Sequence, residues 1–335
     1  RRVQIRLLPV SDAFGADRRH QETGAALSSM GVEAGAKAAI DLGTNTVLMV
    51  IGRKRADGSV EVLDDVHAIA RLGQGVDANR RILPEAQERV CRVLSSYREL
   101  AVSCGADEIR AFGTSALRDA ANKEDFIQRV RSDAGIDLVE VSGADEARHT
   151  FRGAAFGLDL PERYAVVDLG GGSTELALGS EAGLERAASA DVGAVRVTER
   201  CFPQLPPTDQ QQQRGVEMAR GLFEELFPLP DVALVGVAGT VTTLGALDMR
   251  IDRFDAEDLN GHFLKRERVE ELAGHLLSLR YEEIRAMPQV SDQRADIISA
   301  GALILRTFLH VFAQPGLTVS TRGIRYGLLL DMLGA

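Results

Sequence analysis

The sequence has few cysteines and no long apolar run. Its three cysteines show no Cys-x-x-Cys spacing and are odd in number, so we interpret them as reduced thiols of a cytoplasmic protein. No apolar run reaches the roughly 18 residues that a membrane span needs. The best candidate, residues 297–313, is interrupted by Arg306 and His310.

Positive charge is also in short supply. The chain carries 39 Lys and Arg against 49 Asp and Glu, a net charge of −10. This balance argues against broad nucleic-acid binding, which requires a basic face, and predicts weak long-range steering of a polyanion. It leaves an anionic substrate open, because local arginines and a bound metal can dominate a cleft.

Length and composition otherwise indicate a globular protein of two domains. The 335 residues are 45% hydrophobic and 26% charged, and they exceed what one hydrophobic core usually serves. Residues 1–36 are rich in Arg, Gly, Ala and Ser without a clear period. We expect a mobile leader there, with Met30 as a candidate natural start.

The most informative stretch joins two apolar runs around residues 168–175. It contains, in order, Asp168, Gly170, Gly171, Gly172, Ser173, Thr174 and Glu175. The pattern predicts a strand, a tight glycine turn and a second strand. Glycines let backbone N–H groups approach an anion, and the hydroxyls add donors. Because like charges repel, Asp168 would meet a phosphate only through a divalent cation.

A second copy of this pattern lies at residues 38–50. An apolar run ends in Asp41, which is followed by Gly43, Thr44, Asn45 and Thr46 and then by another apolar run. Either copy alone could be an ordinary hairpin. Two copies, each with an Asp at the strand end, predict a duplicated two-lobe fold that binds phosphates between the lobes, as in the actin and sugar-kinase superfamily.

Two further strand-to-helix steps are candidate anion contacts. Residues 113–119 place Arg118 where its guanidinium can clamp a phosphate, or where it can pair with Asp119 or Asp125 on the surface. Residues 238–244 place Gly239 and Thr240 near a nucleoside or the outer phosphates. Alternatively, Thr240 is only the N-cap of a helix. The sequence leaves both alternatives open.

Two arginines outside these steps have plainer interpretations. Arg71 lies in a glycine-bearing loop, where it is either an anion contact or a solvated side chain. Arg294, with Asp292 and Asp296, reads as part of a charged face on the first turns of a helix over 291–312. Residues 204–213, with three prolines and four glutamines, read as a surface connection.

The helix predicted to begin after Ser142 carries a candidate general base. Ser142 as N-cap and Asp145 three residues later form a capping box in which Asp stands in for Glu. The box leaves Glu146 unexplained. Glu146 either gains the usual stabilisation of an acid near a helix N-terminus, roughly 0.3–1 kcal/mol, or acts as a general base.

Together, in this order, the motifs resemble the exopolyphosphatase / guanosine pentaphosphate phosphohydrolase (Ppx/GppA) family. The segments that carry the resemblance are IDLGTNT (40–46), GTSALR (113–118), SGADEAR (142–148), VDLGGGSTE (167–175), VGAVR (192–196) and GVAGT (236–240). The segment 142–148 is the family-specific one. The sequence departs from the family pattern at Asp145 and at Tyr326, where Glu is frequent.

The resemblance implies an α/β, actin-like (ribonuclease H-like) duplicated two-lobe fold with a cleft between the lobes. We expect lobes over 37–149 and 150–320, with a helix over 321–335 returning to the first lobe. The resemblance implies the short, two-domain form of the family, and a homodimer by analogy.

By the same resemblance, the enzyme hydrolyses terminal phosphoanhydride bonds with Mg²⁺ or another divalent cation. Glu146 matches the glutamate that activates water, Asp168 and Glu175 match acids around metal and water, Asp41 matches the acid of the first hairpin, and Arg118 matches a phosphate-binding arginine. We expect inorganic polyphosphate as substrate. The alternatives are guanosine pentaphosphate, a kinase of the same superfamily, and a non-enzymatic actin-like assembly protein.

Overall fold

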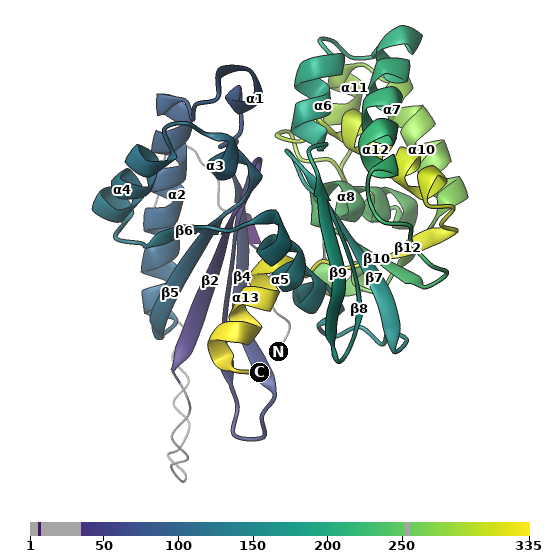
Figure 1. Ribbon diagram of the computed structural model, residues 1–335. Coiled ribbons are helices and arrows are strands. Elements are labelled where there is room, and N and C mark those ends of the chain that lie inside the picture. Colours follow the sequence, from purple (N-terminus) through teal and green to yellow (C-terminus); the bar gives the residue numbers. More distant parts are fainter. Residues whose placement is uncertain (1–5, 8–34, 252–254) are drawn as a thin grey trace.

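The computed structural model describes residues 6–7, 35–251 and 255–335 of the chain, and its strands form two separate sheets (Figure 1). The predicted leader and Met30 lie almost wholly outside the described residues. The first sheet has the order β1 (Arg6–Leu7), β4 (Val60–Ile69), β3 (Thr46–Lys54), β2 (Ala36–Leu42), β5 (Ala106–Gly113) and β6 (Leu138–Glu140). The second has the order β11 (Phe263–Lys265), β12 (Gly316–Val319), β10 (Ala233–Val237), β7 (Arg163–Leu169), β8 (Thr174–Ser180) and β9 (Gly183–Ala190).

The two sheets repeat one topology. In each, three consecutive strands form an antiparallel meander, and two later strands are added in parallel beside the first strand of the meander. The matching orders are β4-β3-β2-β5-β6 and β9-β8-β7-β10-β12. This repetition confirms the predicted α/β, actin-like duplicated two-lobe fold. We call the first sheet with its helices the first lobe, and the second sheet with its helices the second lobe.

Helices cover both sheets. The first lobe carries α1 (Val76–Asn79), α2 (Pro84–Ser103), α3 (Ser115–Asp119) and α4 (Lys123–Ala134). The second carries α6 (Ala194–Cys201), α7 (Asp209–Glu224), α8 (Ala238–Met249), α9 (Ala256–Leu259), α10 (Arg266–Ser278), α11 (Tyr281–Arg285) and α12 (Ile298–Val311). None of the helices in the described ranges has both the length and the apolar character of a membrane-spanning segment.

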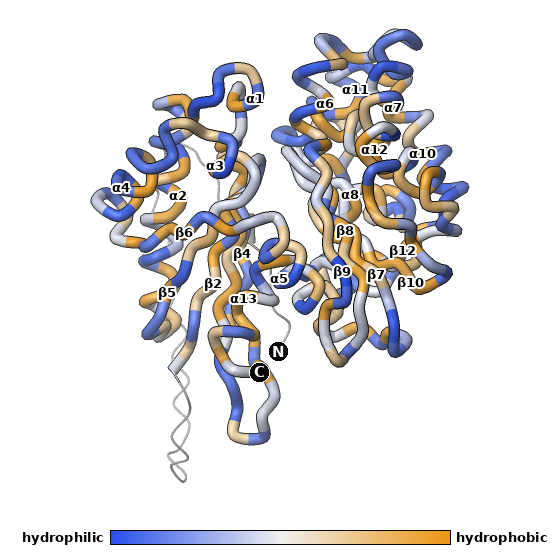
Figure 2. The backbone as a smooth tube through the Cα atoms, in the orientation of Figure 1, coloured by the Kyte–Doolittle hydropathy of each residue, from blue (hydrophilic) through white to orange (hydrophobic). Residues whose placement is uncertain are grey.

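Each lobe has its own hydrophobic core. Apolar stretches follow the inner strands and helix α12 (Figure 2). Eleven of the 14 residues of α12 are buried, because α7, α10 and α8 pack around it. A helix that is apolar on all sides is stable only when it is surrounded in this way.

Two expectations about the second lobe are wrong. Residues 204–213 are not a surface connection throughout, because α7 begins at Asp209 after a full capping box between Thr208 and Gln211. Glutamine is a good helix former, and the prolines precede the cap. The helix expected from residue 291 begins only at Ile298. Residues 291–297 form turns, which changes the setting of Arg294.

Two further helices lie between the sheets, α5 (Gly143–Ala155) and α13 (Ile324–Leu333). They pack against each other; α13 also contacts β2 and β3 of the first lobe, and α5 contacts β7, β8 and β9 of the second. The expected boundary between residues 149 and 150 therefore falls inside α5. The division into domains stays a prediction.

A buried charged network fastens α13 to the first lobe. Arg325 donates to both carboxylate oxygens of Asp65, at 2.9 and 2.8 Å, and the Tyr326 hydroxyl donates to Asp65 at 2.8 Å. Asp65 and Arg325 are 3% and 6% exposed. Tyr326, the departure from the family pattern, thus adds an uncharged donor to a buried carboxylate that already has its cation.

We predict that Tyr326→Phe lowers the free energy of unfolding by about 1.5–3 kcal/mol, the usual contribution of a hydrogen bond to a charged group. Urea unfolding followed by circular dichroism measures the change. Tyr281→Phe is the matched control, because Tyr281 is 36% exposed and surface changes usually stay within about 0.5 kcal/mol. Equal effects of the two substitutions would contradict the role of the network.

Candidate active site

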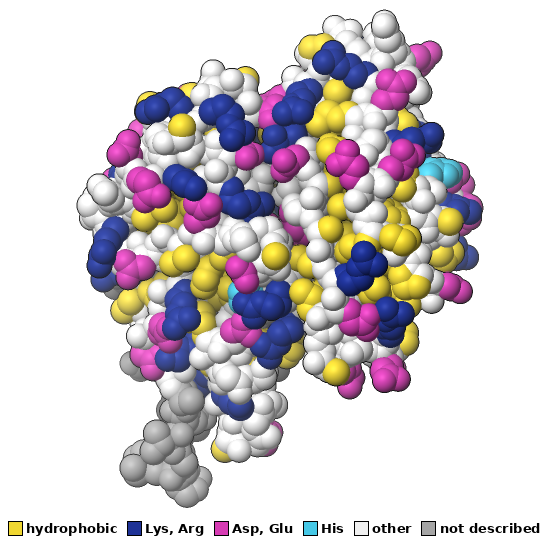
Figure 3. Space-filling model, viewed as in Figure 1, with side chains coloured by type: hydrophobic (Ala, Val, Ile, Leu, Met, Phe, Trp, Pro, Cys, Tyr) yellow, Lys and Arg dark blue, Asp and Glu magenta, His cyan; other side chains and the backbone are white. Residues whose placement is uncertain are grey.

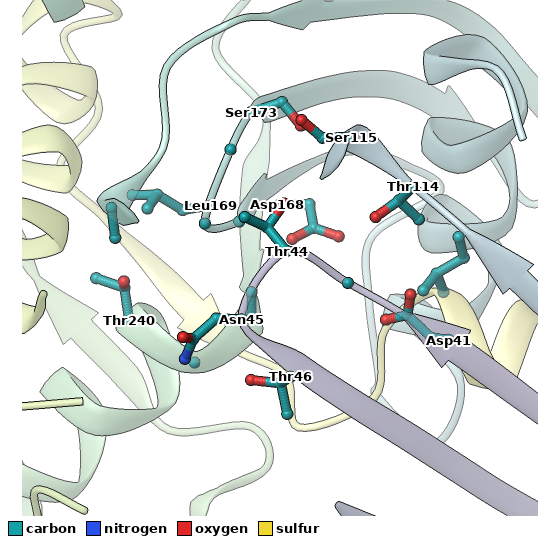
Figure 4. A pocket seen from close by; sticks show the side chains of 18 of the residues that line it. Asp41, Thr44, Asn45, Thr46, Thr114, Ser115, Asp168, Leu169, Ser173 and Thr240 are labelled. Atoms are coloured by element: carbon teal, nitrogen blue, oxygen red, sulfur yellow. The ribbon is translucent and has the colours of Figure 1, made fainter. Parts of the chain in front are cut away.

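A cavity of about 110 Å³ lies where the two glycine hairpins face each other (Figure 4). Asp41 and Asp168 reach it from the ends of β2 and β7, one from each sheet. Most of the predicted site residues line it: Asp41, Gly43, Thr44, Asn45, Thr46, Glu146, Asp168, Gly170, Gly171, Gly172, Ser173, Gly239 and Thr240. Residues that are far apart in the sequence therefore converge on one space.

The second hairpin is oriented by the start of α6. The carbonyls of Gly170 and Gly171 accept hydrogen bonds from the N–H groups of Ala194 and Val195, at 3.0 and 2.9 Å. In a trans peptide the next N–H points opposite to the carbonyl. The N–H groups of Gly171 and Gly172 therefore point away from α6. Both glycines line the cavity, and backbone N–H groups of a glycine turn are typical anion ligands.

The first hairpin is held in a similar way by the loop after β4. The carbonyl of Thr44 accepts from the Gly73 N–H at 2.8 Å, and that of Asn45 accepts from the N–H groups of Ala70 and Arg71 at 3.1 and 3.0 Å. By the same peptide geometry, the N–H groups of Asn45 and Thr46 face the other way. The backbone of this loop thus supports the hairpin.

The side chain of Arg71 has a different role from either one that the sequence suggested. It reaches across to the second lobe, where it donates to both Asp296 carboxylate oxygens at 2.8 and 3.1 Å and to the Gln293 carbonyl at 2.9 Å. It is a tie between the lobes.

Three carboxyl groups line the cavity, those of Asp41, Glu146 and Asp168, and a fourth, that of Glu175, lies behind Asp168. Asp168 and Glu175 are direct partners on β7 and β8, so their side chains leave the sheet on the same face. Asp168 accepts a hydrogen bond from the Thr150 hydroxyl at 3.3 Å, and Glu175 accepts one from Ser189 at 2.8 Å. One carboxylate oxygen of Asp41, Oδ1, is buried without a hydrogen-bond partner.

Burial raises the pKa of each of these four carboxyl groups. Burial, followed by the charge of Glu146, raises the pKa of Asp168 to about 7. The same causes, with Asp168 added, hold the pKa values of Asp41 and Glu175 well above their usual range. A positive charge in the cavity would relieve this repulsion.

Glu146 differs from the others because it has a cation. Arg118 donates to it at 2.5 Å and to the Val141 carbonyl at 3.0 Å, so the alternative pairing of Arg118 with Asp119 or Asp125 is wrong. Burial raises the pKa of Glu146, while Arg118 and a hydrogen bond from Thr114 oppose that rise. Ser142 caps the helix as expected, with its hydroxyl oxygen accepting from the Asp145 N–H at 3.1 Å. The other half of the predicted capping box is wrong, because the Asp145 carboxylate accepts from the Ser142 hydroxyl at 2.8 Å and not from the Ser142 N–H.

Three predicted site residues lie just outside the lining. Arg118 donates a hydrogen bond to Glu146, which lines the cavity. Glu175 lies behind Asp168, its partner on the neighbouring strand. The Thr174 hydroxyl donates to the Val192 carbonyl at 2.6 Å and is fully buried, so in this structure it supports the loop and does not face the cavity.

Sequence reasoning missed the role of Arg294. Its guanidinium lies directly on Gly239, where a methyl group would collide with it, and it lines the cavity. Within the described ranges, the Arg294 side chain has no hydrogen-bond or ion-pair partner. Burial lowers the pKa of Arg294 to about 10, so it remains charged at neutral pH. Thr114 and Ser115 also line the cavity. Both belong to the motif 113–118, but sequence reasoning assigned them no role.

The carboxyl groups fit a Mg²⁺ site of the kind that substrate completes. The described residues contain no cluster of three or more His, Cys, Asp or Glu in metal-binding geometry. Mg²⁺, however, is usually held by one or two carboxylates together with water and substrate phosphates. Asp41, with its unpartnered buried oxygen, and Asp168 supply two such ligands from opposite lobes.

Comparison with known proteins agrees with this geometry. The model of the Ppx/GppA phosphatase family matches residues 50–335. Exopolyphosphatase 2 of Mycobacterium tuberculosis is 35% identical over 314 residues, which cover 89% of this chain and 98% of that protein.

Two solved structures share the whole fold. The Aquifex aeolicus member of the Ppx/GppA family superposes with a TM-score of 0.76 at 30% identity, covering 89% of this chain and 97% of that one. An exopolyphosphatase-like protein superposes with a TM-score of 0.84 at 30% identity, covering 89% and 99%. The chain therefore belongs to the Ppx/GppA phosphatase family, which confirms both the resemblance and the hydrolase class predicted from its motifs.

Proposed function

We propose that the protein is an exopolyphosphatase, which releases orthophosphate from the end of inorganic polyphosphate. One observation carries the proposal: a buried carboxylate, Glu146, lines the same cavity as residues of both hairpins. The similarity to Exopolyphosphatase 2 over 98% of that protein's length supports polyphosphate as the substrate.

In the proposed reaction, the N–H groups of both hairpins and the Arg294 guanidinium hold the terminal phosphates. A water molecule attacks the terminal phosphorus, the bond to the bridging oxygen breaks, and the shortened chain leaves. Glu146 accepts the proton of the attacking water, while Arg118 holds its carboxylate in place. When bound through Asp41 and Asp168, Mg²⁺ would neutralise charge on the phosphate oxygens. Such transfer depends mainly on positioning and charge stabilisation.

The direct experiment measures phosphate release from polyphosphate, with Mg²⁺ and with EDTA. We expect activity that requires the cation, and a 10²–10⁴-fold lower kcat in Glu146→Gln, the usual contribution of a general base. Asp145→Asn is the control, because this neighbouring acid is 55% exposed and points to the helix cap. Binding of polyphosphate to Glu146→Gln should persist.

Near-normal turnover in Glu146→Gln would remove this residue from the role of base. Guanosine pentaphosphate is assayed in parallel, and a higher kcat/KM for it would replace polyphosphate as the substrate. Phosphate transfer from ATP to an added acceptor, without release to water, would indicate a kinase.

We predict that Arg294→Gln raises the KM for polyphosphate by about 10- to 100-fold, which corresponds to about 1.5–3 kcal/mol for a hydrogen bond to a charged group. Arg285→Gln is the control, since Arg285 is 48% exposed and pairs with Asp292. Steady-state kinetics at two salt concentrations measures both variants. A change in KM below twofold for Arg294→Gln would contradict phosphate binding by this arginine.

We also predict that the metal-free protein loses stability as pH rises from about 4 to about 7. Between the unfolded pKa of Asp168, near 3.8, and its folded pKa of about 7, folding takes up a proton, so raising the pH favours the unfolded chain. The loss is up to about 4 kcal/mol at 1.36 kcal/mol per pKa unit.

Urea midpoints in EDTA at pH 5, 6, 7 and 8 test this prediction. Asp168→Asn should flatten the dependence, and Mg²⁺ at pH 8 should restore stability to the wild type by binding the ionised carboxylates. An identical slope in wild type and Asp168→Asn would show that Asp168 does not titrate in this range.

A further inference from the structure

One side chain of the sequence motifs has no part in the site described so far, that of Arg196 at the end of the stretch 192–196. Arg196 lies on the first turn of α6 and is only 6% exposed. A nearly buried arginine is costly unless its donors are all used. The contacts of its guanidinium therefore indicate what it does.

On one side, Arg196 holds the second hairpin. Its Nε donates to the Gly172 carbonyl at 2.8 Å. By the peptide geometry described above, the Ser173 N–H points away from the guanidinium, and Ser173 lines the cavity. Gly193 allows the approach, since a Cβ there would lie 2.5 Å from the Gly171 carbonyl.

On the other side, Arg196 holds the first lobe. Its two terminal nitrogens donate to Asp77 on α1 and to Asp119 on α3, the latter at 2.6 Å. Helix α3 also carries Ser115 and Arg118. Arg200 adds a second pair of bonds to Asp77, at 2.5 and 2.6 Å, but it is 45% exposed and touches no hairpin carbonyl.

The bridge lies beside a close contact between the lobes. A Cβ on Gly172 would lie 2.5 Å from Ser115 Oγ and 2.9 Å from Thr44 Oγ1, so both residues of the first lobe rest on the second hairpin. In Figure 1, α1 and α3 lie across from α6, and in Figure 3 basic and acidic side chains adjoin where the lobes meet. One guanidinium thus contacts the hairpin and both helices of the opposite lobe.

We propose that Arg196 is a positioning residue that couples closure of the lobes to the orientation of the second hairpin. Only when Asp77 and Asp119 are within reach is the guanidinium fixed on the Gly172 carbonyl, and only then does the Ser173 N–H face the transferred phosphate. The inference rests on the proposed hydrolysis for its catalytic consequence, but not for the closure itself.

The first test is kinetic, with wild type, Arg196→Gln, Arg196→Lys and the neighbouring control Arg200→Gln. We expect Arg196→Gln to lower kcat by about 10²–10³-fold, as does the loss of one backbone-type donor to a developing anion, with KM within threefold. Arg196→Lys should fall between Arg196→Gln and wild type, because an ammonium cannot hold three partners in a plane. Arg200→Gln should stay within threefold of wild type.

The second test is structural and needs no substrate. Small-angle X-ray scattering should give Arg196→Gln and Asp119→Asn a larger radius of gyration than wild type and Arg200→Gln. Asp119→Asn keeps the bond to Gly172 and should lose less kcat than Arg196→Gln. If Arg196→Gln fails to fold by circular dichroism, Arg196→Lys and Asp119→Asn carry both tests.

The outcomes separate the two proposals. A wild type that releases no phosphate from any substrate overturns the proposed function, and scattering then decides on closure alone. An active wild type with Arg196→Gln, or Arg196→Lys in its place, within threefold in kcat overturns the positioning role. Identical scattering from all variants overturns the coupling of Arg196 to closure.

Discussion

The structure depends on keeping four carboxyl groups close together at the cavity. Burial raises the pKa of each of them, and the charges of Glu146 and Asp168 raise the pKa values of their neighbours further. Isolated buried charges are very unfavourable unless they are paired. The surrounding elements can be understood as partial compensation: Arg118 for Glu146, Thr150 for Asp168, Ser189 for Glu175, and the charge of Arg325 near Asp41.

The compensation is incomplete, and the residue for which it fails is informative. Asp41 keeps one buried oxygen without a hydrogen-bond partner. Among the described residues, only two other buried side-chain nitrogen or oxygen atoms lack one. Unsatisfied buried groups are rare in folded proteins, and each calls for an explanation such as a catalytic role or a bound water or ion. The same cavity contains a guanidinium without an anion, that of Arg294. An oxygen that lacks a cation and a cation that lacks an anion, in one cavity, match a substrate that arrives with its metal.

Local patterns in the sequence predicted the hairpins, the strand-end aspartates and the cap before Glu146, because each is fixed by neighbours along the chain. The duplicated topology followed from the repeated motif. Arg294 and Arg196 escaped for different reasons: the first was assigned to the wrong element, and the second depends on partners far away in sequence. Arg294 was assigned to a helix that begins four residues later, and Arg196 acts on Asp77 and Asp119, 119 and 77 residues away. Arg118 could be placed near an anion, but its choice of Glu146 over Asp119 is a property of the folded lobes.

The acidity of the chain does not conflict with a polyanionic substrate. At physiological ionic strength the Debye length is about 8 Å, so exposed acids on the outer helices contribute little inside the cleft. The electric field there is set by groups that are shielded from solvent and are therefore screened less than exposed charges. These groups are the hairpin N–H groups, Arg294 and Arg325. The partner of Arg325, Asp65, also accepts a hydrogen bond from Tyr326. Burial, followed by the charges of Arg294 and Arg325, lowers the pKa of His67 to about 4, so this histidine is neutral. Arg294 lines the cavity together with Asp41 and Asp168, and this pairing of opposite charges would orient an anionic substrate that carries a cation.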